Sequence, residues 1–480
     1  MWIEYLSVIF VVLLGLLYWN VARRRSRPYF PGPPPLPIIG NIVPPGHLWK
    51  KLAIFSQQYG PMFSLRTFGK FMLVLNSAAT ARALLDGKSA IYWTRPMPKL
   101  IELAGMDRGV LFESDPNRLR QSRKMLNLIL GPRQLETYRI MIEKYVVQFL
   151  HNLLESPEGF AEHARSVPGG IALETLLSIT SPKLIDLVRT LLTLYLSSQI
   201  FRLFFPAWIQ REAFSWRDQY TDMAEHGYKF TQGEIVKGTM RPSMISKALE
   251  RPDEYSEYVI KYTSAQVYSG GADTTVSSIL TFFSTMVLHP DVQRRAQAEI
   301  DQVVGSDRLP RYSDQSNLPY TNAVLTEIIR LFIPIPIIAR VPAQDDVHNG
   351  CYISKDTLIV INLWAMMRDE TVYPDPDAFK PERWLSKDRD NKSDPWSIGF
   401  GFGRRICPGR DLAEQILFTT VACILATFDI SPATDENGNV VTPSGEFTDG
   451  AIIFPLPFKC NIRPRSPRVR DIIAEAVNAY

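Results

Sequence analysis

The segment of the chain best suited to carry out chemistry lies near its carboxyl end, where Cys407 stands among glycines and arginines. A cysteine binds a metal only as a thiolate, so its surroundings must favour the anion. Pro408 suits the first turn of a following helix, whose free N–H groups and positive end would face the sulfur. Gly403 and Gly409 let the backbone pass close to a flat, bulky group, and Arg405 can pair with an acidic group on it. Such a loop fits a haem held by one axial thiolate.

The spacing around this cysteine is Phe-x-x-Gly-x-Arg-x-Cys-x-Gly, matched by Phe400, Gly403, Arg405, Cys407 and Gly409. It resembles the haem-ligand signature of the cytochrome P-450 superfamily. The alternative is a buried structural cysteine in a glycine-rich turn, which five matched positions at fixed spacing argue against. The resemblance implies that Cys407 is the axial iron ligand and that the cofactor is haem (heme b, iron protoporphyrin IX).

A second segment lies inside a long helical pattern at 256–289, where Gly270 and Gly271 precede Asp273 and Thr274. A glycine in a helix costs roughly 1 kcal/mol relative to alanine, so the pair needs a reason. One reason is close approach of a ligand, and the other is a crossing point where another element packs closely. An acid beside an alcohol at such a place can relay protons to bound dioxygen. The segment resembles the family's oxygen-activation motif, which implies that Asp273 and Thr274 form this acid–alcohol pair.

A third constellation is a pair of charges in an otherwise apolar run. Glu327 and Arg330 are three residues apart and so share one face of a helix. On a solvated face such a pair contributes little, but a buried pair needs a further partner, and Arg383 can supply it. The pattern resembles the family's Glu-x-x-Arg and Pro-Glu-Arg-Trp set. The resemblance implies a buried structural triad that holds the core around the haem loop.

Arginines are the expected partners of the haem propionates. The family's Trp-x-x-x-Arg reads Leu119-x-x-x-Arg123 here, so Arg123 is kept while the tryptophan is missing. Arg123 and Arg405 are the main candidates, and Arg340 is a weaker third. The region 159–214 also looks short and atypical for the family, which puts activity in doubt.

The amino terminus predicts location. Residues 5–19 form an apolar run at the short end for a membrane span of roughly 20 residues. A cleaved signal peptide would carry its positive charges before this run, whereas here Glu4 precedes it and four arginines follow. We expect a transmembrane anchor at 1–21 and a basic, proline-rich hinge at 22–41. The predicted location is the endoplasmic reticulum membrane, crossed once, with the remainder cytosolic.

The elements that must position these residues are mostly helical. Helical patterns cover 48–59, 78–85, 118–130, 134–154, 182–203, 211–229, 256–289, 291–304, 320–332 and 410–428. Strand-like runs at 61–68 and 70–74 predict one hairpin, and runs at 347–353 and 358–362 predict another. A last strand is expected near 452–462. The predicted class is mainly α with small β-sheets, and the resemblance implies the cytochrome P-450 fold, with 42–480 as one haem-thiolate monooxygenase domain.

Composition limits the partners. The net charge of +4 is too small to indicate nucleic acid, and the four cysteines show no paired spacing. No convincing dinucleotide motif is present, so electrons must come from outside. A positive patch of Arg120, Lys124, Arg404 and Arg410 would steer an acidic donor. The resemblance implies an NADPH-cytochrome reductase, and it admits a b-type cytochrome as a second donor.

The implied activity is monooxygenation, in which O₂ and two electrons hydroxylate or epoxidise a lipophilic small molecule. The expected pocket walls are 97–112, 267–271, 334–338 and 447–452, which are mostly apolar. The stretch 362–384 resembles fungal members of secondary metabolism, which implies a terpenoid or polyketide intermediate. Two alternatives stay open: a haem-thiolate isomerase or dehydratase that needs no external electrons, and an inactive haem-binding homologue.

Overall fold

The computed structural model describes residues 29–37, 39–67, 69–177, 207–386 and 393–480. Three predicted segments lie outside these residues: the anchor at 1–21, the basic part of the hinge and the helix at 182–203. Within the described ranges, every helix is too short or too polar to cross a membrane.

The described chain is mainly helical with three small sheets, which confirms the predicted class. Its helices are α2 (Leu48–Tyr59), α3 (Ala78–Ala81), α4 (Lys99–Leu103), α5 (Pro116–Leu130), α6 (Pro132–Thr137), α7 (Arg139–Glu155), α8 (Phe160–Leu177), α10 (Ala207–Lys237), α11 (Met244–Leu249), α12 (Glu257–Leu288), α13 (Pro290–Val303), α14 (Pro319–Leu331), α15 (Leu363–Met366), α16 (Pro395–Gly399), α17 (Arg410–Thr427) and α18 (Arg468–Ala479). Its strands are β1 (Met62–Thr67), β2 (Lys70–Leu75), β3 (Ile337–Arg340), β4 (Asp346–His348), β5 (Cys351–Ile353), β6 (Leu358–Asn362), β7 (Phe428–Thr434), β8 (Val440–Val441) and β9 (Cys460–Pro464).

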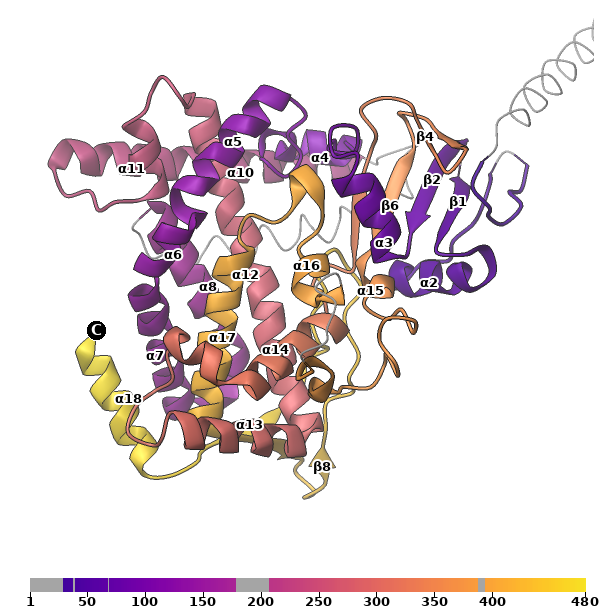
Figure 1. Cartoon of the computed structure of the whole chain (residues 1–480). Helices are drawn as coiled ribbons and strands as arrows, with labels where there is room; N and C mark the ends of the chain where they lie inside the picture. Colours follow the sequence, from indigo (N-terminus) through magenta and orange to yellow (C-terminus); the bar gives the residue numbers. More distant parts are fainter. Residues whose placement is uncertain (1–28, 38, 68, 178–206, 387–392) are drawn as a thin grey trace, which may run out of the picture.

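Helix α12 is the central element of the fold. It begins after Ser256, whose side chain accepts a hydrogen bond from the Val259 N–H. It then runs for 32 residues, most of them buried, because neighbouring helices cover it on several sides. Figure 1 shows it in the middle of the helical body, and it packs against α5, α8, α10, α14 and α17. A helix that is apolar nearly all round is stable only when it is enclosed in this way.

The largest sheet joins segments far apart in the chain, in the order β1-β2-β6-β3. Strand β6 runs parallel to β2 and antiparallel to β3. The predicted hairpin between 347–353 and 358–362 is therefore wrong. The first of these runs is itself a hairpin, β4–β5, which turns at Asn349 and Gly350, both with positive φ. An Asn-Gly pair is the usual turn of a two-residue hairpin, so a local signal for this pairing was present.

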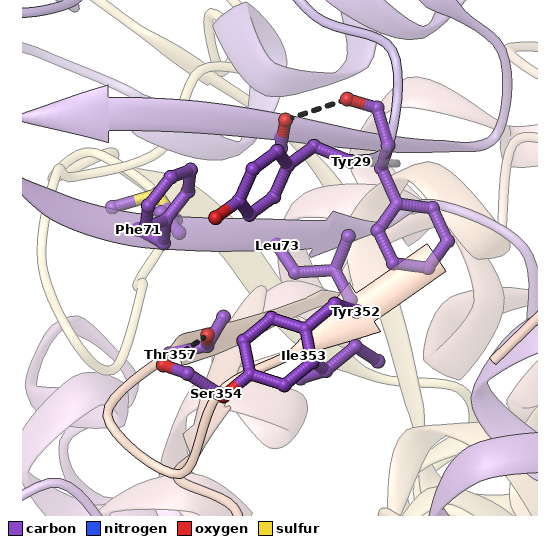
Figure 2. A pocket seen from close by; sticks show the side chains of 10 residues that line it. Tyr29, Phe71, Leu73, Tyr352, Ile353, Ser354 and Thr357 are labelled. Atoms are coloured by element: carbon purple, nitrogen blue, oxygen red, sulfur yellow. Dashed lines mark hydrogen bonds between the residues drawn. The ribbon is translucent and has the colours of Figure 1, made fainter. Parts of the chain in front are cut away.

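A small cleft lies where the described chain enters this sheet (Figure 2). Its volume is about 70 Å³, and it is lined by Tyr29, Phe30, Ser64, Phe71, Met72, Leu73, Tyr352, Ile353, Ser354 and Thr357. The rings of Tyr29 and Phe71 stack at 4.8 Å on one side of it. None of its lining residues belongs to α12 or to the Cys407 loop, so this cleft is distinct from the candidate catalytic site.

Candidate active site around Cys407

The loop before α17 holds Cys407 by its backbone. The Cys407 N–H donates to the Phe400 carbonyl over 2.8 Å, which closes the loop from Phe400 to Cys407. Gly409 is the N-cap of α17, whose first helical residue is Arg410. Pro408 therefore precedes the helix, whereas the sequence placed it in the first helical turn. The sulfur still faces the start of the helix, because the Gly409 N–H bonds to it.

Two opposing effects act on the pKa of the Cys407 thiol. Cys407 has exposed surface but lies deep among protein atoms, and burial raises the pKa of its thiol. The Gly409 N–H and the positive charges of Arg123 and Arg410 act in the opposite direction, without reversing the shift. The protein alone thus presents a thiol with three groups placed to stabilise its anion. Such a cysteine suits a cationic iron centre, whose charge would favour the thiolate further.

Gly403 lets the loop approach a neighbouring turn closely. Its φ is +60°, and a Cβ built there would lie 2.1 Å from the Leu85 carbonyl oxygen. Its N–H donates to the Asp86 carboxylate over 2.7 Å. At the start of the loop, the Phe400 ring stacks on Trp396 with centroids 5.6 Å apart and the two ring planes nearly parallel. These contacts fix the loop at both ends, and any side chain at Gly403 would push it off.

The arginines near the loop form an unusual concentration of positive charge in the interior. Arg405 is buried and donates to the backbone carbonyls of Trp93 (2.8 Å), Val110 (2.7 Å) and Glu113. Burial, followed by the charges of Arg95 and Arg123, lowers the pKa of Arg405 to about 9. Because like charges gathered in a low-dielectric interior need an anion, the haem propionates fit this donor set.

The two predicted propionate partners also have protein contacts of their own. Arg123 donates to the carbonyl of Ile406, next to Cys407, over 2.8 Å. Three of the five N–H groups of Arg405 serve backbone carbonyls, so it also braces the loop against 93–113. Arg340 is fully buried and donates to the Ala339 carbonyl. Sequence reasoning missed Arg95, whose Nη1 donates to the same carbonyl over 3.2 Å, because no motif marked it.

The glycine pair of α12 has open space beside it. Gly270 and Gly271 are exposed within a mostly buried helix, and a Cβ at either position would meet no heavy atom within 4 Å. Among the described residues, no other element packs on this face, so the described part of the chain shows no crossing point at these glycines. Thr274, half-buried one turn later, donates its hydroxyl to the Gly270 carbonyl over 3.0 Å. The helix therefore presents backbone and an alcohol to this space.

Asp273 points elsewhere. It is buried, and its Oδ1 lies 3.9 Å from Nη1 of Arg165 on α8. Asp273 and Thr274 are adjacent in the chain, so they diverge by about 100° around the helix. The structure thus gives the acid an ion-pair partner on α8 and leaves the alcohol at the open glycine face. Arg165 was not predicted, since it lies in the atypical region 159–214 and matches no motif.

The predicted triad of Glu327, Arg330 and Arg383 is in contact in the structure. Glu327 and Arg330 on α14 are fully buried and joined by two hydrogen bonds of 2.8 and 2.9 Å. Arg383 donates to Glu327 over 2.9 Å, and the Trp384 indole N–H does so over 2.8 Å. Arg330 also donates to carbonyls of the following loop, including Met367 at 2.8 Å. The predicted triad is therefore one part of a larger satisfied network, which ties α14 to the segment that leads into the Cys407 loop.

One of the expected pocket walls, 97–112, contacts α10. An apolar cluster joins 97–112 to Ala213 and Trp216 on α10, and α10 in turn packs on α12. Leu119, which stands where the family has tryptophan, is buried in α5. Of the atypical region, 160–177 and 207–214 are helical, and the part between them lies outside the described residues.

Comparison with known proteins decides the family. The cytochrome P450 family model matches residues 30–450. The chain belongs to the cytochrome P450 family. It is 36% identical to the cytochrome P450 monooxygenase claR of Ampulloclitocybe clavipes, over 96% of this chain and 91% of that protein. Monooxygenase 208 of Postia placenta is 35% identical over 97% and 96% of the two chains, and ppsD of Aspergillus oryzae is 34% identical over 96% and 94%.

This P450 is accordingly a monooxygenase and an oxidoreductase. The family implies a haem-thiolate cofactor, O₂, an organic substrate and a reductase in general terms. The residues present fit that cofactor, since Cys407 receives a backbone N–H and the charges of Arg123 and Arg410, and Arg405 lies near Arg95 and Arg123 with Glu113 as the nearby carboxylate.

Proposed function

We propose that this P450 is a membrane-anchored monooxygenase that hydroxylates or epoxidises a lipophilic terpenoid or polyketide intermediate of secondary metabolism. Its electrons come from an NADPH-cytochrome reductase, with a b-type cytochrome as a second donor. The observation that carries the proposal is the cysteine loop, in which the Gly409 N–H bonds to the sulfur of Cys407 at the start of α17. The substrate class rests on the apolar expected walls and on the similarity to fungal monooxygenases.

In this proposal, haem b supplies dioxygen activation and transfer of one oxygen atom to a C–H or C=C bond. Cys407 holds the iron, while Arg123 and Arg405 hold the propionates. The open face at Gly270 admits dioxygen and substrate beside the α12 backbone. Thr274 orients a proton donor there, and Asp273, held near Arg165, exchanges protons with the interior. The chain's own contribution is ligation, positioning and proton supply.

If Asp273 and Thr274 deliver protons, their replacement should uncouple NADPH consumption from product formation. In the Asp273→Asn variant we expect product formation to fall about 100-fold, since general acid–base groups contribute 10²–10⁴-fold. Thr274→Ala should consume NADPH without an equal yield of product. The measurement is product formed per NADPH oxidised, with reductase and any substrate that the parent enzyme accepts. Turnover without NADPH would instead indicate an isomerase or dehydratase.

A neighbouring threonine provides the control. Thr275 makes the same type of hydrogen bond as Thr274, from its hydroxyl to the carbonyl four residues earlier, also at 3.0 Å. It is buried rather than at the open glycine face. Thr275→Ala should therefore keep its coupling. Equal coupling in the Thr274→Ala and Thr275→Ala variants would contradict the role of Thr274.

The anchor is tested by deletion. We expect the full chain to stay in the membrane fraction through an alkaline carbonate wash, because a spanning segment leaves only with detergent. Deletion of residues 1–21 should move most of the protein into the wash. Some peripheral attachment should remain, since Leu36 in the hinge and Ile42 directly after it are 54% and 62% exposed. Release of the full chain by carbonate would rule out the anchor.

A further inference from the structure

Near the open face of α12, two buried oxygen atoms have no hydrogen-bond partner in the part of the chain that the structure describes. Gln266 on α12 is 9% exposed, and Tyr220 on α10 is 3% exposed. The Gln266 Nε2 donates to Ser269 over 2.7 Å, but among the described residues the Gln266 Oε1 accepts no hydrogen bond and the Tyr220 hydroxyl makes none. A buried polar atom left unpaired costs roughly 1–3 kcal/mol, so two of them side by side need a reason.

The two oxygens converge on one point. A Cβ built on Gly109 would lie 2.3 Å from Gln266 Oε1 and 2.6 Å from Tyr220 Oη, so both atoms fill the place of a side chain at this position. Gly109 ends the short turn Met106–Arg108, and Gly105, with φ +68°, begins it. The pair is thus enclosed by α10, α12 and a glycine-bounded turn of the expected pocket wall. Access to it requires this turn to shift.

The pair lies on the side of α12 that turns gradually toward the candidate catalytic face. Gln266, Gly270 and Thr274 follow one another at intervals of four residues, so each is rotated by about 40° from the one before it, and Thr274 stands about 80° around the helix from Gln266. Eight residues of helix span about 12 Å along the axis. A molecule held at Gln266 and lying along the glycine face would place its other end near Thr274.

We propose that Gln266 and Tyr220 bind a hydroxyl group of the substrate, about 12 Å from the carbon that is oxidised. A hydroxyl satisfies both atoms at once, since it donates to Gln266 Oε1 and accepts from the Tyr220 O–H. A hydrocarbon satisfies neither, and an ether can only accept. The substrate is then an already oxygenated lipid, so an earlier hydroxylation or hydration step must supply it. This inference rests on the proposed function, of which it specifies the substrate class.

The test compares three probes of nearly equal shape: farnesol, its deoxy hydrocarbon and its methyl ether. Calorimetry on the full chain in detergent should show farnesol binding about 2- to 10-fold more tightly than the other two, as expected for one or two neutral hydrogen bonds. Gln266→Leu and Tyr220→Phe should each reduce this preference and leave affinity for the hydrocarbon nearly unchanged.

A matched control lies on the same helix. Tyr268 is also buried, and its hydroxyl makes no hydrogen bond within the described ranges, but it is two residues from Gln266 and so faces nearly the opposite way. Tyr268→Phe should keep the preference for farnesol. Equal affinity of the parent chain for all three probes would overturn the proposal. So would equal losses for every probe in the two variants, which would assign the pair to an internal water or to packing. The reduced, carbon-monoxide-bound spectrum, recorded separately, tests the haem itself, so the two failures are distinguishable.

Discussion

Replacement of Cys407 by alanine should abolish the thiolate-type band in the reduced, carbon-monoxide-bound difference spectrum, together with all monooxygenase activity. The reason is that the loop supplies one sulfur to the site, aimed by the Cys407–Phe400 backbone bond and the Gly409 N–H. Alanine keeps these backbone contacts and removes only the ligand. The loss should therefore be complete while the protein still folds, as circular dichroism and the yield of purified chain will show.

Replacement of a second cysteine is the control, because it shows whether the loss of the band is specific to Cys407. Cys460 on β9 is half-buried and outside the loop, so Cys460→Ala should keep the full band. Cys423 is less suitable, because it is buried and its thiol donates to the Pro310 carbonyl, so its replacement also leaves a cavity. A thiolate band that persists in Cys407→Ala would refute the assignment of the axial ligand.

Residues in fixed-spacing motifs could be located from the sequence because their chemistry is local. The Cys407 loop is closed within eight residues, and Glu327 and Arg330 meet across one helical turn. Helices with strong periodicity were also predictable, since α2 has the expected bounds and α12 differs by one residue at each end. Helix α8 was missed, because Pro168 and two following glycines break its pattern, and packing against α7 and α12 overrides their low propensity.

Contacts between distant segments could not be predicted from local patterns. The partners of Arg405 on 93–113 are about three hundred residues away, and nothing in either stretch signals the other. Strand β6 pairs in parallel with β2, far earlier in the chain, where adjacency suggested a hairpin with the preceding run. The divergence of Asp273 from Thr274 follows from helix geometry, but its ion pair with Arg165 depends on how α8 packs. Long-range packing therefore decides which groups each motif residue meets.

The largest loss of stability is expected from replacement of Glu327 by alanine. Both carboxylate oxygens are saturated by donors from Arg330, Arg383, Trp384 and the Lys380 N–H, and Glu327 and Arg330 have no exposed surface. Burial alone would raise the pKa of Glu327, but the hydrogen bonds and charge of Arg330, the Lys380 N–H and the charge of Arg383 together outweigh it and lower the pKa, so the carboxylate is charged near neutrality. Its removal leaves the Arg330 charge buried without a counterion, which costs about 3–5 kcal/mol.

That cost is a large part of the 5–15 kcal/mol by which a folded domain is typically stable. We therefore expect Glu327→Ala to yield little or no haem-containing protein, and Glu327→Gln to be strongly destabilised, since its amide places N–H against donors. Glu382 is a matched control in the same segment, because it also pairs with an arginine, Arg295 at 2.6 Å, but is half-exposed. Glu382→Gln should cost less than about 1 kcal/mol. Thermal unfolding and the haem content per chain measure both effects, and similar losses in the two variants would show that Glu327 acts as an ordinary surface charge rather than as the centre of the network.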